Sequence, residues 1–293
     1  VDVYRQKTPP QKNLLRLGLY LALFPKLVMG PIVPYHELEP ALAQRTIDAQ
    51  DVSDGCFRFT IGLAKKALLA DALAGLVTGI WGDLASLTVL SAWLGLIGYA
   101  LQLYFDFSGY SDMSIGLGRM LGFRFPENFR YPYLCSSISD FWRRWHISLG
   151  SWFKEYLYFP LGGSRTGTLR TLRNLLLVWL ATGLWHGASW NYVLWGLYFG
   201  VLICLEKLLA PRFRAHPRKG LLAGLYRPVC LLLAVLGWVL FRAEDLPAAG
   251  RYFACLFGGA AGASAQARLY LHDFWPVLLL GAVGATPLCA KLA

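Results

Sequence analysis

Long apolar runs separated by short charged segments dominate the pattern of the chain. The clearest is the charge-free stretch Leu84–Phe105, which lies between Asp83 and Asp106. A second charge-free stretch, Asn174–Leu205, contains His186 as the only group that titrates near neutral pH. Because a helix needs roughly 20 mostly apolar residues to cross the hydrocarbon of a bilayer, both runs predict membrane-embedded helices.

Four weaker apolar runs extend this pattern. Two need their flanking residues to reach the length of a span, and two are interrupted by basic residues, which is typical of tilted or interfacial helices. They are Val229–Phe241 and Phe274–Ala290, and Leu14–Val33 and Phe57–Ile80. The chain lacks the alternation of an outer-membrane barrel, so backbone groups in lipid have to be satisfied within helices. We therefore expect an all-α polytopic membrane protein, with residues 1–293 as a single membrane-embedded domain.

Basic segments on both sides of Asn174–Leu205 predict its orientation. Gly162–Arg173 carries three arginines and no acid, and Glu206–Gly220 carries five basic residues against one acid. Such segments face the cytoplasm, so the run between them has to leave and return to one side. Two full crossings need about 40 residues and a turn, but the run has only 32 residues. We expect a re-entrant hairpin or tilted short helices that bend near Ser189-Trp190-Asn191, with His186 near the tip.

The segment Phe141–Phe159 is rich in aromatic residues, which make up eight of its nineteen positions. Trp, Tyr and Arg at this density are typical of the headgroup boundary. The pattern predicts an amphipathic helix that lies against the membrane or covers a cavity, capped at Ser139 or Asp140. At helical spacing one face of this helix carries Phe141, Trp145, Leu149, Trp152 and Tyr156.

The composition excludes most soluble classes of protein. Apolar side chains make up 56% of the chain and charged ones 15%, whereas soluble domains carry roughly 25% charged residues. A net charge of +11 would suggest nucleic acid in a soluble protein, but in a membrane protein it indicates cytoplasmic loops and lipid headgroups. We expect membrane lipid, and no nucleic acid, as a partner. The six cysteines have no zinc spacing and are expected to be reduced and buried, and no metal site is predicted.

His186 is the strongest candidate for chemistry. An ionisable residue at membrane depth is costly and often functional, although a neutral histidine in a helix–helix hydrogen bond is an equal alternative. Gly183 and Gly187 bracket it and permit close approach of another helix or a ligand. Desolvation is expected to lower the pKa of the imidazole and keep it neutral at pH 7, which suits a general base.

Other polar residues have two interpretations each. His146 is either functional or an interfacial residue, and the pair Arg143-Arg144 binds either donor phosphates or, as the sequence favours, lipid headgroups. Asp106 and Asp112 are expected to be structural partners of arginine, with Gly109 breaking the run between them. Three further histidines are expected at the surface: His36, His216 and His272.

Five motifs follow one another along the chain. They are Tyr104-Phe105-Asp106-Phe107-Ser108-Gly109-Tyr110-Ser111-Asp112, the segment Gly116–Phe129, Phe141-Trp142-Arg143-Arg144-Trp145-His146, the segment Tyr158–Ser164, and Gly183-Leu184-Trp185-His186-Gly187-Ala188. Together they strongly resemble the membrane-bound O-acyltransferase family. They look most like its alginate O-acetyltransferase branch, which also includes peptidoglycan O-acetyltransferases and the D-alanyl transferase of teichoic acids. The resemblance covers most of the chain to about residue 245.

The resemblance implies a helical bundle around a central funnel, with an acyl thioester donor on the cytoplasmic side and an acceptor hydroxyl on the far side. The donor would be acetyl-CoA or an acylated carrier protein, and no tightly bound cofactor is implied. His186 matches the catalytic histidine of the family and His146 the second family histidine. The resemblance also implies that the N-terminal spans of the family are missing from this sequence.

On this basis His186 is expected to take the proton of the acceptor hydroxyl as the hydroxyl attacks the thioester. The oxyanion that forms needs a hydrogen-bond donor, and His146, Asn128 and Asn191 are all open candidates. The residues expected to bind substrate are Asn128, Arg143, Arg144, Trp185 and Asn191.

The expected function is O-acetylation of an alginate-like polysaccharide by a multi-pass enzyme of the bacterial inner membrane, together with a periplasmic acetyltransferase-like partner protein. One alternative is acyl transfer to peptidoglycan or teichoic acid through a partner protein. Another is a non-enzymatic polysaccharide-export transporter that uses His186 and the aspartates as a relay or gate. A scaffold for an export complex is a third, and it predicts that histidine substitutions are silent.

Overall fold

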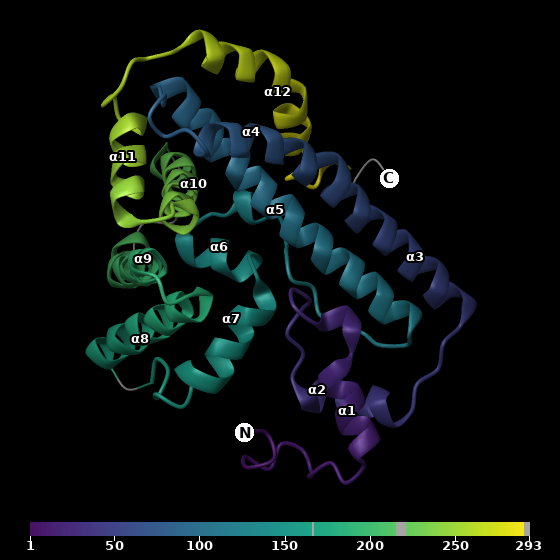
Figure 1. The fold of residues 1–293 in the computed structure, drawn as a ribbon. Coiled ribbons are helices and arrows are strands. Elements are labelled where there is room, and N and C mark those ends of the chain that lie inside the picture. The colour runs from purple at the N-terminus through teal and green to yellow at the C-terminus, as the bar shows by residue number, and fades with distance from the viewer. Residues whose placement is uncertain (166, 215–220, 290–293) are drawn as a thin grey trace.

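The computed structural model describes residues 1–165, 167–214 and 221–289, and every regular element in this part of the chain is a helix (Figure 1). The all-α prediction is therefore confirmed for the described residues. Short 3₁₀ or π-helical segments are labelled η. The elements are α1 (Leu14–Ala22), η1 (Phe24–Lys26), α2 (Tyr35–Ala43), α3 (Ala49–Ala64), η2 (Lys65–Ala70), α4 (Asp71–Trp81), α5 (Val89–Met120), η3 (Pro132–Leu134), α6 (Ile138–Arg144), α7 (Ile147–Phe153), η4 (Lys154–Tyr158), α8 (Thr168–His186), α9 (Trp190–Arg214), α10 (Leu221–Arg242), α11 (Leu246–Leu256) and α12 (Ala265–Gly284).

Three described helices are long and apolar enough to cross a membrane: Val89–Met120, Trp190–Leu209 and Gly224–Arg242. They cover most of the predicted run Leu84–Phe105, the second half of Asn174–Leu205 and all of Val229–Phe241. Two other predicted runs need correction. Leu14–Val33 is not one helix, because α1 has only 9 residues and rises about 14 Å, too little to cross the hydrocarbon. The run Phe274–Ala290 is displaced, since α12 begins at Ala265 and ends at Gly284.

The segments α3, η2 and α4 form one helical rod that runs antiparallel to α5 (Figure 1). Glycines allow the two to touch: a Cβ at Gly62 would lie 2.5 Å from the Gly109 carbonyl oxygen, and one at Gly55 would lie 2.7 Å from the Gly116 carbonyl oxygen. The expectation that Gly109 breaks the helix is therefore wrong. In this position glycine allows close helix packing, and α5 continues through it to Met120.

Ion pairs join the same two elements. Asp112 accepts from Arg58 Nε at 2.8 Å and from Lys65 Nζ at 2.5 Å. Asp106 pairs with Lys66 at 2.8 Å. The predicted structural role of the two aspartates is confirmed, although the partner of Asp106 is a lysine rather than an arginine. The lysines that interrupt the apolar run Phe57–Ile80 are thus neutralised by acids, two of which lie on α5.

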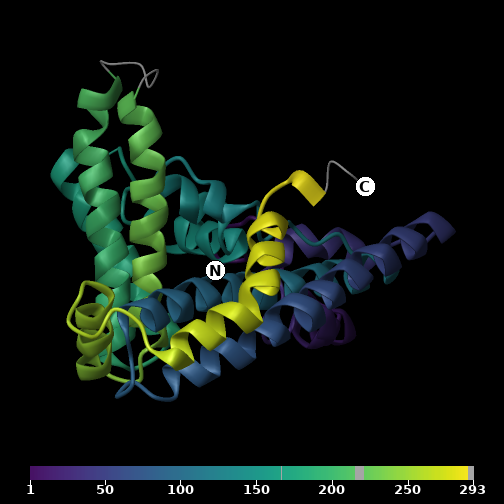
Figure 2. The same cartoon turned by 90° about the horizontal axis from the view of Figure 1, so that it is seen from above.

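The second half of the chain is built around the hairpin of α8 and α9. α8 ends at His186 and α9 begins at Trp190, so the predicted bend is confirmed. The helices are longer than expected, with 19 and 25 residues, because both continue past the charge-free run into its basic flanks. In Figure 2 α9 and α10 stand side by side, across the direction of α3 and α5.

The cysteines agree only in part with the prediction. No disulfide joins any of the six in the described part of the chain, and Cys135, Cys204 and Cys230 are buried as expected. Cys56 and Cys289 are exposed. In a protein dissolved in lipid, an apolar environment does not require burial inside the protein, which explains why sequence context failed to separate the two groups.

The glycine contacts predict a stability difference between two equivalent substitutions. Gly62→Ala places a Cβ against the backbone of α5, so we expect about 1–3 kcal/mol of destabilisation from forced separation of the helices, and a lower midpoint of thermal unfolding in detergent. Gly250→Ala in α11 is the control, because nothing lies within 4 Å of its Cβ position. Equal midpoints for the two variants would contradict the packing role of Gly62.

Candidate active site

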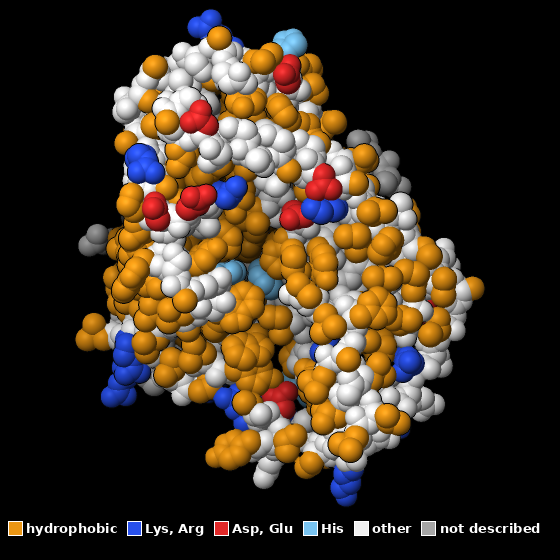
Figure 3. Space-filling view, viewed as in Figure 1, with side chains coloured by type: hydrophobic (Ala, Val, Ile, Leu, Met, Phe, Trp, Pro, Cys, Tyr) orange, Lys and Arg blue, Asp and Glu red, His pale blue; other side chains and the backbone are white. Residues whose placement is uncertain are grey.

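A cavity of about 440 Å³ brings the two candidate histidines together. Residues of α5, α6, α7, η4, α8, α9 and α10 line it, and its wall is mostly aromatic and aliphatic. Both His146 and His186 face this space. Figure 3 shows histidine side chains inside a hollow that is surrounded by hydrophobic side chains.

The aromatic segment that contains His146 is not the single helix that its spacing predicts. α6 ends at Arg144, α7 begins at Ile147, and His146 between them has the left-handed backbone angles φ 46° and ψ 53°. This conformation is unfavourable for a residue other than glycine, so surrounding contacts have to hold it. The predicted apolar face is divided as a result: Trp145 and Leu149 are buried, whereas Trp152 is 40% exposed.

Asn128 supplies the contacts that hold this break. Its backbone carbonyl accepts from the Ile147 N–H at 3.0 Å, and its side-chain Oδ1 accepts from the Ser148 N–H at 3.1 Å and the Ser148 hydroxyl at 2.9 Å. Oδ1 also lies 3.2 Å from Nδ1 of His146. Asn128 is almost fully buried and does not line the cavity. In this structure it therefore supports His146 from behind.

The start of α6 is fixed by a residue that the sequence analysis did not single out. Glu206 of α9 accepts from the Ile138 N–H at 2.6 Å and the Ser139 N–H at 2.9 Å, and it also accepts from the Tyr226 hydroxyl at 2.6 Å. A carboxylate at a helix N-terminus is favoured by the helix dipole. The N-cap is Ser137, not Ser139 or Asp140. The sequence signal for this role of Glu206 was a single acid within a basic segment. The sequence does not reveal its partner, because Ile138 lies 68 residues away.

His186 lies at the C-terminal end of α8. Its neighbours are aromatic rings, with Trp195 at 5.0 Å and Phe241 at 5.1 Å between ring centroids. In the described part of the chain no hydrogen bond to its ring fixes its tautomer. The ring of Trp185 lies 4.9 Å from His186 and 6.3 Å from His146, and is itself half exposed.

Both histidines lie outside the three candidate spans, and both are held uncharged by burial. Desolvation lowers the pKa of His146 to about 3, with a smaller contribution from nearby His186. Desolvation also lowers the pKa of His186, to about 4. The neutral imidazole expected from the sequence agrees with this environment, so each ring has one nitrogen that can accept a proton at pH 7.

Of the other expected site residues, Arg143 lines the cavity, whereas Arg144 and Asn191 lie outside its lining. Arg143 lines the cavity and donates to the Ser139 carbonyl at 3.1 Å, whereas Arg144 pairs with Asp140 at 3.1 Å and does not line it. Asn191 is buried away from the cavity and donates to the Ala243 carbonyl at 2.6 Å. Lys154, which the sequence analysis passed over, also lines the cavity.

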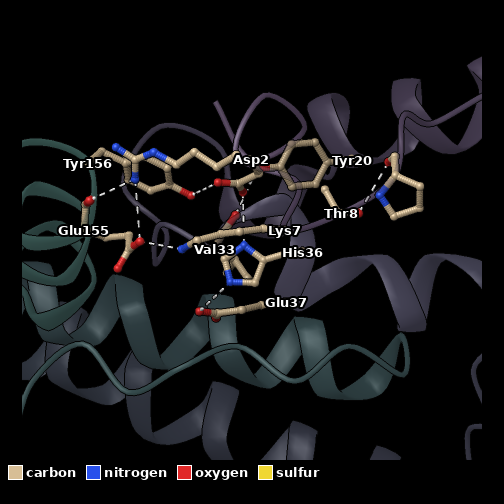
Figure 4. A network of polar contacts seen from close by, with 11 residues as sticks. Asp2, Lys7, Thr8, Tyr20, Val33, His36, Glu37, Glu155 and Tyr156 are labelled. Atoms are coloured by element: carbon tan, nitrogen blue, oxygen red, sulfur yellow. Dashed lines mark hydrogen bonds and ion pairs between the residues drawn. The ribbon is translucent and has the colours of Figure 1, made fainter. Parts of the chain in front are cut away.

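The remaining histidines lie elsewhere. His36, expected at the surface, is only partly exposed in the first turn of α2, where Nδ1 lies 3.0 Å from Asp2. Asp2 also accepts from the Tyr156 hydroxyl at 2.6 Å. This network ties the N-terminal segment to η4 beside a second cavity of about 300 Å³ (Figure 4). His272 is exposed as predicted, and His216 lies outside the described residues.

Two uncharged imidazoles in one apolar cavity of a helical membrane protein define a site suited to moving protons away from bulk water. The chain belongs to the membrane-bound O-acyltransferase family, whose model matches residues 6–237. This family match confirms the resemblance seen in the motifs.

Three relatives illustrate the range within the family. The chain is 46% identical to the probable alginate O-acetylase AlgI of Pseudomonas fluorescens, over 88% of the chain and 51% of the relative. It is 39% identical to the peptidoglycan O-acetyltransferase of Helicobacter pylori, over 81% of the chain and 45% of the relative. It is 30% identical to the teichoic acid D-alanyltransferase of Bacillus subtilis, over 66% of the chain and 51% of the relative. The chain spans about half the length of these relatives.

The contacts of Glu206 predict that its charge supports the site. Glu206→Gln replaces one acceptor with an NH₂ group that faces N–H or O–H donors, so we expect the protein to lose about 1–3 kcal/mol of stability. The midpoint of thermal unfolding in detergent measures this effect. Glu244→Gln is the matched control, because Glu244 is exposed. If the two variants behave alike, Glu206 does not hold α6.

Proposed function

We propose that this protein is an O-acetyltransferase that passes an acetyl group from a cytoplasmic thioester donor across the bacterial inner membrane to a hydroxyl acceptor, for O-acetylation of an alginate-like polysaccharide. The observation that carries this proposal is the pair of neutral histidines, buried His146 and partly buried His186, in one apolar cavity. Family membership supports the reaction class, and the AlgI relatives support the acceptor class.

In the proposed reaction His186 is the general base. The proton of the acceptor hydroxyl moves to the imidazole, the hydroxyl oxygen attacks the thioester carbonyl, and the carbon–sulfur bond breaks. The thiolate that leaves takes the proton from the imidazolium, so charge and protons balance. General-base assistance contributes roughly 10²–10⁴-fold, and holding the two substrates together contributes up to roughly 7–11 kcal/mol. In this reaction the apolar wall of the cavity would limit the water available to hydrolyse the thioester.

The donor in this proposal is anionic, either acetyl-CoA or an acylated carrier protein. Two cations of the cavity wall suit its phosphate groups. Arg143 forms a hydrogen bond to a carbonyl but no ion pair among the described residues, and Lys154 packs over the Phe159 ring at 5.5 Å. Arg144, already paired with Asp140, is the weaker candidate for this role.

The proposal predicts the effect of removing each imidazole. His186→Ala in the complete protein is expected to lower transfer of labelled acetyl groups from the donor at least about 10²-fold, and His146→Ala is expected to impair it severely. Both variants should insert into the membrane at normal levels. His272→Ala is the control, because this histidine is 83% exposed. Normal acetyl transfer by His186→Ala would refute the proposal and leave a transporter or scaffold as the better reading.

The acceptor is tested separately by mass spectrometry of glycans from cells that carry the wild-type protein or His186→Ala. We expect O-acetyl groups to be lost from an exopolysaccharide. Loss from peptidoglycan, or loss of D-alanyl groups from teichoic acid, would overturn the acceptor class and retain the reaction class.

A further inference from the structure

The hydrogen bonds of Asn128 fix the orientation of its side-chain amide. A backbone N–H can only donate, so the atom that faces the Ser148 N–H at 3.1 Å has to be the oxygen. The Ser148 hydroxyl donates to the same oxygen at 2.9 Å, and the amide nitrogen of Asn128 donates to the Ser111 hydroxyl at 3.2 Å. The backbone contact fixes the orientation, and the two hydroxyl contacts fit it, for a side chain that is only 1% exposed.

This orientation determines the tautomer of His146. The Asn128 oxygen has no proton to give, so at 3.2 Å the Nδ1 of His146 has to be the donor. A neutral imidazole carries one proton, which leaves Nε2 with a free lone pair. The ring of Phe107 packs nearly perpendicular to the His146 ring, at 4.6 Å between ring centroids, and contributes no hydrogen bond. His186 differs, because nothing in the described part of the chain selects its tautomer.

We propose that Asn128 is a positioning residue that holds His146 as the Nδ1–H tautomer, so that Nε2 binds an O–H or N–H group of a substrate in the cavity. This inference rests on the proposed function and deepens it. His186 takes the proton of the reacting hydroxyl, whereas His146 accepts a hydrogen bond from a second donor group. That group belongs either to the acceptor, as a neighbouring hydroxyl, or to the acyl donor, as an amide N–H.

The tautomer of His146 also bears on which residue can donate a hydrogen bond to the oxyanion. Neutral His146 presents a lone pair and no N–H to the cavity, so it cannot stabilise a developing negative charge. The amide nitrogens of Asn128 and Asn191 are bonded to Ser111 and to the Ala243 carbonyl, and neither residue lines the cavity. His146, Asn128 and Asn191 were the sequence candidates for the oxyanion donor. As long as His146 is neutral, none of them can fill that role in this structure.

The charged and titratable groups that share the cavity with His146 are few. They are His186 of α8, Arg143 of α6, and Lys154 and Tyr158 of η4. None of them is an acid that would stabilise the imidazolium, and the two cations and His186 disfavour a second positive charge. Protonation of His146 would remove the Nε2 lone pair, so the proposed contact exists only while the ring is neutral.

Asn128→Asp tests the proposal through a pH profile. A carboxylate beside Nδ1 keeps the tautomer but stabilises the imidazolium, and a neighbouring opposite charge shifts a pKa by about 1–3 units. Because such a rise brings the pKa of His146 from about 3 to or above that of His186, about 4, we expect a second ionisation to enter the acid limb of kcat/KM and to move it to higher pH by up to about two units. Ser111→Ala is the matched control, because it removes a partner of Asn128 and leaves the contact with His146 in place. Its acid limb should coincide with that of the wild type.

The KM values identify which substrate His146 contacts. Asn128→Ala releases the tautomer and is expected to raise one KM about tenfold, with little change in kcat. A rise in the KM of the thioester assigns the contact to the donor, and a rise in the KM of the hydroxyl compound assigns it to the acceptor. Changes in kcat alone, with both KM values unaltered, would overturn the binding role.

A measurement on the unmutated protein keeps the test independent of folding defects. In ¹⁵N-histidine-labelled protein, with His146→Gln for assignment, we expect a protonated Nδ1 and an unprotonated Nε2 at neutral pH. The opposite tautomer, or an unshifted acid limb in Asn128→Asp, overturns the inference even if His186→Ala is inactive. Full activity of His186→Ala would instead refute the proposed function, so the two failures are distinguishable.

Discussion

A polar group withdrawn from water has to find a partner inside the protein, and this constraint explains most of the architecture. Asp112 meets two cations of the neighbouring rod, and Glu206 meets the free N–H groups at the start of α6. Asn128 meets the N–H groups that the break before α7 leaves unpaired. His186 differs from these groups, because its ring has aromatic neighbours and no hydrogen bond among the described residues. In the proposed reaction this leaves its imidazole available to a substrate.

Features that depend on neighbours in sequence were the ones that the sequence predicted. Long apolar runs indicated α5 and α9, and a shorter run with its flanking residues indicated α10. A run too short for two crossings indicated the bend before Trp190. The length of α8 and α9 was underestimated, because arginines near a helix end were treated as boundaries although their long side chains can extend away from the apolar region.

Features that depend on distant residues were missed. The spacing of Phe141–Phe159 suits one helix, but a left-handed residue at His146 interrupts it, and the contacts that stabilise this turn come from Asn128. In the sequence Gly109 is typical of a helix break, whereas in the structure it allows close contact with Gly62 of the neighbouring helix. His186 was found from its place in an uncharged run and His146 from its aromatic motif, whereas the roles of Asn128 and Glu206 required knowledge of which helices lie side by side. Periodicity contains no such information, since it describes one element at a time.

The ion pairs that Lys65 and Lys66 form with acids affect how membrane topology is inferred from such sequences. Counting basic residues next to apolar runs assigns them to the cytoplasmic side, yet these two lysines face acids within the protein: Lys65 contacts Asp112, and Lys66 contacts Asp71 and Asp106. Their charge is cancelled locally, so it exerts little pull toward either leaflet. A count of lysines would therefore assign the rod of α3, η2 and α4 a cytoplasmic end. In the folded protein these two charges do not favour either side of the membrane.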